Sequence, residues 1–217
     1  MSPTLFPDRF FMIDDSALQQ LREWCASDKR RLLGIIGLPG SGKSTLTDWL
    51  TEQLATKVAV IPMDGFHLAN NQLRALNRLA RKGAPDTFDV RGYQALLRRV
   101  KQAGSDETIY APCFHREIEE SIAGEIVIPP EVRLIITEGN YLLSQEAGWE
   151  ETLSLLDESW FINVDERQRL TQLKRRHQAF GRTEEEAEQW ILSTDQPNAE
   201  LIKRTAYRAD RQITIKQ

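Results

Sequence analysis

A glycine-rich stretch in the first quarter of the chain holds residues that could bind phosphate. Residues 37–45 read Gly-Leu-Pro-Gly-Ser-Gly-Lys-Ser-Thr and match the pattern G-x-x-x-x-G-K-[ST]. Glycines allow a tight turn that brings several backbone N–H groups onto one anion, and a following helix adds the positive end of its dipole. Lys43 can reach the β- and γ-phosphates of a nucleoside triphosphate, and the Ser44 hydroxyl can ligate Mg²⁺. The residues expected to contact the triphosphate are Gly37, Gly40, Ser41, Gly42, Lys43, Ser44 and Thr45.

The flanking sequence decides whether this match is more than a surface turn rich in Gly and Ser. Residues 31–36 form a short apolar run of the kind that a buried parallel strand shows. After the loop, Leu46, Trp49, Leu50 and Leu54 recur at helical spacing. Because strand, loop and helix follow in the order that the motif requires, the context favours a nucleotide-binding loop.

Two acidic residues follow later strand-like runs. Asp64 comes after residues 57–61 and a proline, and Glu138 ends the apolar run that starts at residue 132. Ligands of open α/β sheets bind at the carboxyl ends of the strands, so both acids are expected near the triphosphate. Glu138 would position Mg²⁺ or its water shell, or act through water or on a second substrate. An Asp before Gly is also common in plain turns, which leaves a structural role for Asp64 open.

Length and charge restrict the class of protein. The 217 residues suit one α/β domain with a sizeable core, and we expect a single domain over 1–217. Lys and Arg total 28 against 32 for Asp and Glu, a formal net charge of −4. This balance and the lack of a basic run argue against a nucleic-acid partner.

The cysteines and the apolar segments indicate the compartment. Cys25 and Cys113 lie far apart without metal-type spacing, so we expect reduced, structural thiols. Residues 1–15 lack the basic start and long apolar core of a secretory signal, and no apolar run approaches the length of a membrane span. We therefore expect a cytoplasmic protein without a membrane partner.

The order of the expected elements predicts the fold class. Strands alternate with amphipathic helices behind the phosphate loop, which is typical of a three-layer α/β/α fold with a mostly parallel sheet. The expected strands cover residues 31–36, 57–61, 108–111, 125–128, 132–137, 160–164 and 212–215, and prolines follow those at 108–111 and 125–128.

A mobile lid is expected at about 174–198. Gly181 ends one helix, residues 183–186 form a capping box for the next, and a further break is expected at 195–198. The adjacent Arg175 and Arg176 point about 100° apart on a helix, so both cannot face one phosphate. We expect one or two of Arg175, Arg176 and Arg182 to enter the site, with Arg175 as the catalytic candidate. A solvated basic face is the alternative for the rest.

The function class follows from what accompanies the loop. GTPase switches need an Asn-Lys-x-Asp sequence, which is absent, and motors need further modules. Transfer of a phosphoryl group to a small hydroxyl compound needs a positioning acid, Mg²⁺ and cations around the γ-phosphate, which this chain can supply. The three histidines share no metal-ligand spacing, so a zinc site is not expected. His67 and His115 follow candidate site strands and could bind substrate, or have structural roles.

Four further motifs carry a resemblance to a known family. They cover residues 63–67 (MDGFH), 82–89 (KGAPDTFD), 110–116 (YAPCFHR) and 137–143 (TEGNYLL). With them the chain resembles the uridine kinase, phosphoribulokinase and pantothenate kinase family of P-loop kinases, most of all small bacterial members described as fructose-transport kinases. The resemblance implies Mg²⁺ and ATP as cofactors, Asp64 as the base for the acceptor hydroxyl, and Glu138 beside metal and acceptor. It places Tyr110, Phe114, His115 and Arg116 in the acceptor pocket and Asn198 near the adenine.

One departure concerns the acceptor. Uridine kinases read Phe-Asp-His-Pro-Asp-Ala-Phe-Asp before the long helix, and their first Asp holds the ribose hydroxyls. Gly83 stands at the matching position here, which makes a nucleoside a less expected acceptor than a sugar or a pantothenate-like compound. The alternative function is a nucleotide-hydrolysing switch or chaperone that acts on a protein. A homodimer is compatible with the sequence.

Overall fold

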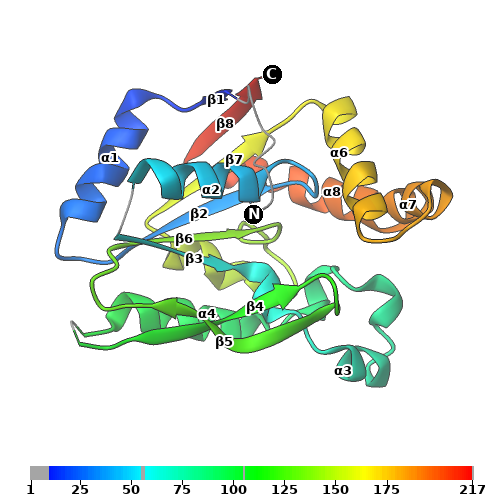
Figure 1. Cartoon of the computed structure of the whole chain (residues 1–217), viewed down its shortest axis with the longest axis horizontal. Coiled ribbons are helices and arrows are strands. Elements are labelled where there is room, and N and C mark those ends of the chain that lie inside the picture. Colours follow the sequence, from blue (N-terminus) through cyan, green and yellow to red (C-terminus); the bar gives the residue numbers. More distant parts are fainter. Residues whose placement is uncertain (1–9, 55–56, 105, 217) are drawn as a thin grey trace.

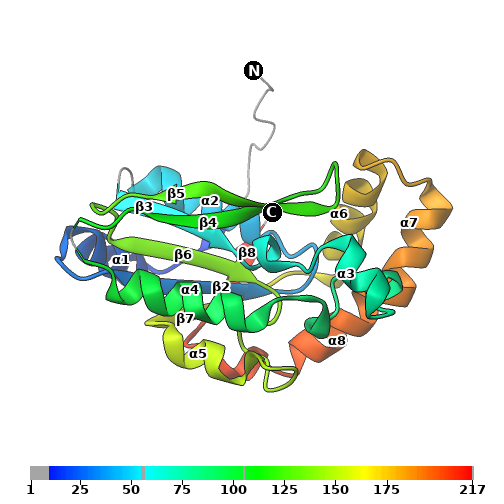
Figure 2. The same ribbon diagram turned by 90° about the horizontal axis from the view of Figure 1, so that it is seen from below.

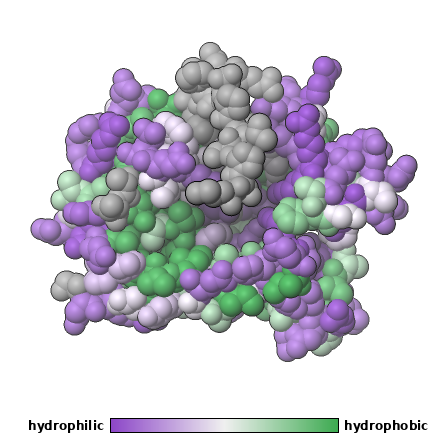
Figure 3. All heavy atoms as spheres, in the orientation of Figure 1, coloured by the Kyte–Doolittle hydropathy of each residue, from purple (hydrophilic) through white to green (hydrophobic). Residues whose placement is uncertain are grey.

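The computed structural model describes residues 10–54, 57–104 and 106–216 (Figure 1). Residues 1–9, most of the stretch in which we expect no secretory signal, lie outside this range. In the described residues, no helix combines the length and apolar character needed to cross a membrane. Figure 3 shows apolar side chains gathered in the lower half of the view, where Figure 1 places strands β4 and β5.

The central sheet confirms the expected mostly parallel arrangement. Its strand order is β1-β8-β7-β2-β6-β3, and the five strands from β8 to β3 run parallel. β1 adds an antiparallel edge strand beside β8 that the sequence patterns did not predict. The strands are β1 (Phe10–Met12), β2 (Arg31–Gly37), β3 (Val58–Pro62), β6 (Leu134–Gly139), β7 (Glu158–Asn163) and β8 (Arg211–Lys216).

Helices cover both faces of this sheet, so the three-layer prediction is confirmed (Figures 1 and 2). The alternation of β2 divides the core, because successive side chains of a strand point to opposite faces. Leu33 and Ile35 pack in the hydrophobic cluster on the face of the sheet that the first two helices of the chain cover. Leu32 and Ile36 pack in the hydrophobic cluster on the opposite face. The first face carries α1 (Asp15–Ala26) and α2 (Lys43–Leu54), and the second α4 (Val90–Gln102), α5 (Thr152–Leu155) and α8 (Gln196–Lys203).

A separate two-stranded hairpin lies against the end of β3. β4 (Ile109–His115) pairs antiparallel with β5 (Glu120–Ile128), and both contact the 3-10 turn Met63–Phe66 that follows β3. The expectation that a strand stops at Pro112 is wrong. The register shifts between Ala111 and Cys113, and this irregularity lets the strand continue past a residue that has no N–H to donate.

The lid is a chain of helices with one true break. Gly181, with φ +92°, separates α6 (Glu166–Ala179) from α7 (Glu184–Trp190), and the capping box of Thr183 and Glu186 opens α7 as expected. The break expected at 195–198 is wrong. The chain passes through a π-helical turn, Ile191–Asp195, directly into α8. Pro197 sits in the first turn of α8, the part of a helix that tolerates proline best.

Arg169 joins the lid helix to the phosphate loop. Its side chain is fully buried in α6 and its Nη1 donates to the carbonyl of Pro39 at 3.2 Å. Its other nitrogens donate to the carboxylate of Glu166 at 2.7 and 3.0 Å and to Gln196 Oε1 at 2.5 Å. One guanidinium thus ties α6, the start of α8 and the loop together.

Replacing Arg169 by Ala is expected to lower the free energy of unfolding by about 3 kcal/mol, because it leaves a buried carbonyl without its donor and opens a cavity. Urea unfolding followed by circular dichroism measures this loss. The exposed neighbour Arg167, replaced by Ala, is the control and should change stability by less than about 0.5 kcal/mol. Equal losses in the two variants would contradict the anchoring role.

Candidate active site

A cavity of about 800 Å³ opens where β2, β3 and β6 end. The lid and the short helix α3 (Asn70–Ala75) lie beside these strand ends, at the right of Figure 1. This is the edge at which ligands of parallel sheets bind. Its walls include Pro39, Gly40, Ser41, Gly42, Lys43, Ser44, Thr45, Asp64, His67, Lys82, Gly83, Phe114, Arg116, Glu138, Asn140, Arg175, Arg176, Arg182, Trp190 and Asn198.

The phosphate loop has the backbone geometry expected of an anion cradle. Gly40 and Gly42 adopt positive φ angles of 80° and 86°, which favour glycine. A Cβ at Gly40 would lie 2.7 Å from Leu173 Cγ of α6, so the loop passes directly under the lid helix. The Ser41 hydroxyl is buried behind the loop, beside Gly37, without a hydrogen-bond partner among the described residues.

Lys43 is held over the loop by three oxygens. Its Nζ donates to the carbonyls of Gly37 and Leu38 at 3.1 and 3.2 Å and to Asn140 Oδ1 at 2.6 Å. Burial lowers the pKa of Lys43 to about 8, although the carboxylates of Glu138 and Asp64 oppose this shift. Gly37 does not line the cavity. Its carbonyl lies behind the loop and orients Lys43. Asn140, which sequence reasoning did not single out, is a second support for Lys43.

The two acids occupy different electrostatic environments. Burial alone would raise the pKa of Asp64, but charge interactions with His67, Arg116 and Lys43 lower it below its usual value. Arg116 Nη2 donates to Asp64 Oδ2 at 3.1 Å. Burial raises the pKa of Glu138, although Lys43 opposes the shift. Asp64 therefore stays ionised and can accept a hydrogen bond from a hydroxyl.

The oxygen atoms at this end of the cavity suit a hard dication. The Ser44 hydroxyl and the carboxylates of Asp64 and Glu138 all line the cavity. The Glu138 carboxylate makes no hydrogen bond or ion pair with any described residue, although it lies close enough to Lys43 for their charges to interact. Mg²⁺ binds one or two protein oxygens and fills its other positions with water and phosphate. These residues fit Mg²⁺.

Aromatic and basic side chains form the wall opposite the phosphate loop. The His67 ring packs against Phe88 at 4.1 Å and Phe114 at 4.6 Å between centroids, and its Nδ1 lies 2.8 Å from the carbonyl of Asp64. Lys82 Nζ lies 5.0 Å over the Phe114 ring and donates to Asn70 Oδ1 at 2.8 Å. A path of packed side chains therefore leads from Asp64 to Lys82, a residue that sequence reasoning named only as part of a motif.

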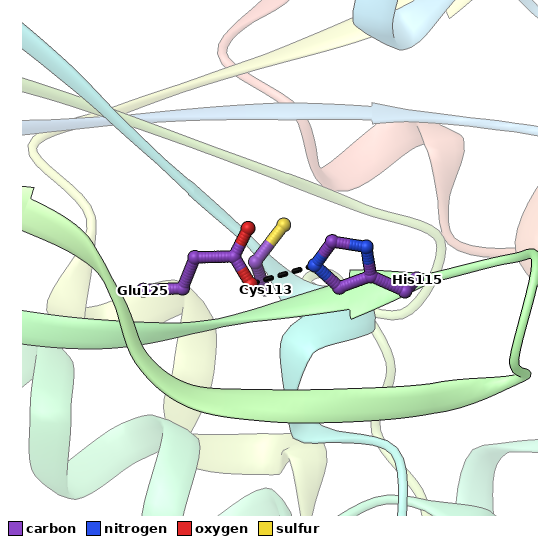
Figure 4. A group of neighbouring side chains, drawn as sticks. All are labelled: Cys113, His115 and Glu125. Carbon is purple, nitrogen blue, oxygen red and sulfur yellow. Dashed lines mark hydrogen bonds and ion pairs between the residues drawn. The ribbon is translucent and has the colours of Figure 1, made fainter.

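The structure divides the residues of motif 110–116 between two faces of the hairpin. Phe114 and Arg116 line the cavity, whereas Tyr110 and His115 do not. Tyr110 is 56% exposed, and His115 Nε2 lies 2.6 Å from Glu125 Oε2 (Figure 4). Adjacent strand residues point to opposite faces, so Phe114 and His115 cannot share the pocket, and Tyr110, four residues from Phe114 along the strand, lies outside it. Tyr110 and His115 thus lie outside the cavity in which the resemblance places them, and their contacts with an acceptor stay a prediction.

The lid arginines differ in environment. Arg175 lies at the exposed rim of the cavity, whereas Arg176 points among charged groups: burial and the nearby Arg116 lower its pKa, and Asp195, Asp64 and Glu138 oppose the shift. Arg176 makes no hydrogen bond or ion pair to the side chains that the structure describes. It is the cation best placed for an anionic ligand.

Arg182 is fixed by other lid residues. Its Nη1 lies 2.6 Å from His177 Nδ1, and His177 Nε2 lies 2.7 Å from Asp195 Oδ2. Its guanidinium also stacks 4.2 Å from the Trp190 ring centroid. The π-helical turn that ends at Asp195 brings this carboxylate into the buried pair. Asn198, one turn further on, lines the cavity as the family resemblance implies.

Comparisons with known proteins agree with this geometry. A scan against models of protein families finds no match for the chain. The chain is, however, 31% identical over 207 residues to a Schizosaccharomyces pombe protein named "Putative uridine kinase", with 90% of this chain and 88% of that protein covered. A crystal structure from Silicibacter sp. TM1040, described as a "putative fructose transport system kinase", superposes with a TM-score of 0.80 and 34% identity over 90% of this chain and 98% of the other.

The chain belongs to the phosphoribulokinase, uridine kinase and pantothenate kinase family of P-loop kinases. Another relative, an ATP-dependent kinase-like protein of Aspergillus versicolor, is 36% identical over 148 residues that cover 64% of this chain and 86% of that protein. The relatives of this P-loop kinase therefore indicate ATP as the phosphate donor. Their names leave the acceptor open.

Proposed function

We propose that this P-loop kinase transfers the γ-phosphoryl group of ATP, with Mg²⁺, to an alcohol group of a small metabolite. The observation that carries the proposal is the position of Asp64. It lines the same cavity as the phosphate loop, stays ionised, and is held by Arg116. A carboxylate beside the phosphate loop, with an aromatic and basic wall beyond it, is suited to position a hydroxyl against the γ-phosphate.

Each group has a distinct role in this proposal. Lys43 and the loop amides hold the phosphates, and Asp64 orients the acceptor hydroxyl and finally accepts its proton. Such an Asp needs no raised pKa, because phosphoryl transfer is largely dissociative and the hydroxyl proton leaves late. Ser44 and Glu138 would hold Mg²⁺ or its water shell, and the bound ion would neutralise charge on the phosphates. Arg176, alone or with Arg182, would contact the transferred group when the lid closes.

The acceptor is expected to be a sugar, a polyol or a pantothenate-like compound. Gly83 lines the cavity at the position where uridine kinases carry the Asp that holds ribose. Gly83 has a φ of +96° and no described atom lies within 4 Å of its Cβ position, so this position of the backbone offers no carboxylate. Nucleosides are therefore the less favoured class.

A screen of ATP consumption tests the proposal. The protein with Mg·ATP is incubated with sugars, polyols, nucleosides, pantothenate and related vitamins, and both ADP and the phosphorylated product are measured. One acceptor class should stimulate ADP formation with an equal amount of product. Slow hydrolysis that no acceptor stimulates would instead favour a regulatory switch or chaperone.

The division of the hairpin gives a paired prediction for the acceptor site. Replacing Phe114 by Ala is expected to raise the KM for the acceptor about tenfold, because it removes the ring that packs between His67 and Lys82. Replacing the exposed Tyr110 by Ala should change it less than about twofold. Steady-state kinetics at saturating ATP measure both, and a larger effect at Tyr110 would show that the acceptor lies on the other face.

A further inference from the structure

A group of possible metal ligands lies on the hairpin outside the cavity. Cys113 Sγ, a ring nitrogen of His115 and a carboxylate oxygen of Glu125 all lie within 4.8 Å of one another (Figure 4). None of the three residues lines the active-site cavity. Cys113 and His115 come from β4 and Glu125 from β5, so the group bridges the two strands.

An irregularity in the hairpin brings these side chains together. Ala111 pairs with Ile126 and Cys113 with Ile122, so three residues of β5, 123–125, stand opposite the single residue Pro112. Gly124 in this bulge has a φ of +74°, which turns the backbone and redirects the next side chain, Glu125. Bulges often redirect a side chain in this way next to functional sites.

We propose that Cys113, His115 and Glu125 form a binding site for a divalent transition-metal ion such as Zn²⁺. A thiolate, an imidazole and a carboxylate are the three ligand types that Zn²⁺ accepts, with bonds of about 2.0–2.3 Å. Ligand atoms on a tetrahedral ion would then lie roughly 3.3–3.7 Å apart. The observed limit of 4.8 Å is within reach of small side-chain rotations, and the His115–Glu125 hydrogen bond would open to admit the ion.

The surroundings of the three residues are compatible with such an ion. Zn²⁺ binds the thiolate form of cysteine, so the Cys113 proton must leave as the ion binds. Glu117 Oε2 lies 3.9 Å from His115 Nδ1, where a carboxylate can orient an imidazole whose other nitrogen holds metal. The side chains of His115 and Glu125 are 37% and 40% exposed, which leaves a fourth position open to water.

A bound ion would connect the outer face of the hairpin to the active site. Cys113 and His115 alternate along β4 with Phe114 and Arg116, which line the cavity. A metal bridge from β4 to β5 would hold this end of the hairpin in one register. The ion would therefore make the part of the cavity wall formed by Phe114 and Arg116 more rigid. This effect does not depend on which acceptor the enzyme uses.

Cobalt titration of the metal-free, full-length protein tests the site. Co²⁺ bound by a thiolate gives a charge-transfer absorption band. No described residue that lines the active-site cavity contains sulfur, so the band reports a cysteine site outside it. We expect one equivalent of Co²⁺ to produce the band and Zn²⁺ to abolish it, in the presence of excess Mg²⁺. Glu125→Gln should weaken binding at least about tenfold.

Matched cysteine variants decide between the proposal and chance binding. Cys113→Ser should lose the band, whereas Cys25→Ser, which removes the other free cysteine from α1, should keep it. Circular dichroism checks that both variants fold. Zn²⁺ should raise the thermal midpoint of the wild type and of Cys25→Ser, but not that of Cys113→Ser. Absence of the band in the wild type, its persistence in Cys113→Ser or its loss in Cys25→Ser would overturn the proposal.

Discussion

Replacing Asp64 by Asn should lower turnover by about 10²–10⁴ while ATP binding persists. The substitution keeps the size of the side chain but removes the negative charge that, in the proposed mechanism, positions the acceptor hydroxyl and receives its proton. ATP binding should survive because the phosphates are held by Lys43 and the loop amides. Turnover is measured as product formation with the acceptor found in the screen, and ATP binding by calorimetry without acceptor.

The control for this variant is Asp48→Asn. Asp48 is an exposed residue of α2, one turn beyond the phosphate loop and outside the cavity, so its replacement should leave turnover within about twofold. Arg116 loses its partner in Asp64→Asn, but its side chain is 39% exposed and can be solvated, so the fold should persist. Unchanged turnover in Asp64→Asn would remove Asp64 from the mechanism.

The parts of the fold that the sequence predicts are those with local causes. The strand 31–37 is a continuous apolar run because both of its faces are buried, and that signal is visible without any tertiary information. The phosphate loop likewise needs its glycines for its own backbone angles. Edge strand β1 gives no such signal, because its three residues form a strand only by pairing with β8 near the other end of the chain.

The acceptor wall shows why a motif does not by itself define a site. The resemblance placed all of Tyr110, Phe114, His115 and Arg116 in one pocket, although a strand can present only alternate residues to one face. That alternation predicts the separation of Phe114 from His115. It does not predict that Tyr110, four residues before Phe114 and beyond the register shift at Pro112, lies outside the cavity.

The lid arginines depend on the rotation of α6 about its axis. Sequence spacing shows that Arg175 and Arg176 diverge, but not which of them faces the phosphates. Arg169 fixes the rotation by its bond to the phosphate loop, and Leu173 packs over Gly40 on the same side. Arg176 lies seven residues after Arg169, about 20° from it around the helix, whereas Arg175 lies about 120° away. The helix side anchored on the loop therefore carries Arg176 toward the cavity.

Replacing Arg176 by Gln should consequently lower turnover by about 10²–10³, because it removes a desolvated cation from the charge that develops on the transferred group. Arg175→Gln is the matched control, one residue away on the same helix, and should lower turnover less than about tenfold. Stopped-flow and steady-state assays with saturating ATP and acceptor separate this loss from weaker binding.

The reverse order of these two losses would have a definite structural meaning. A larger effect at Arg175 would require α6 to rotate by roughly 100° when the lid closes. Such a rotation would break the buried bond between Arg169 and Pro39. The variant Arg169→Ala should then favour closure and lower the KM for ATP. If α6 keeps its observed rotation, Arg169→Ala should instead raise that KM, because the loop and Arg176 lose their common support. Measuring turnover and the KM for ATP in Arg175→Gln, Arg176→Gln and Arg169→Ala distinguishes a helix of fixed rotation from one that rotates on closure.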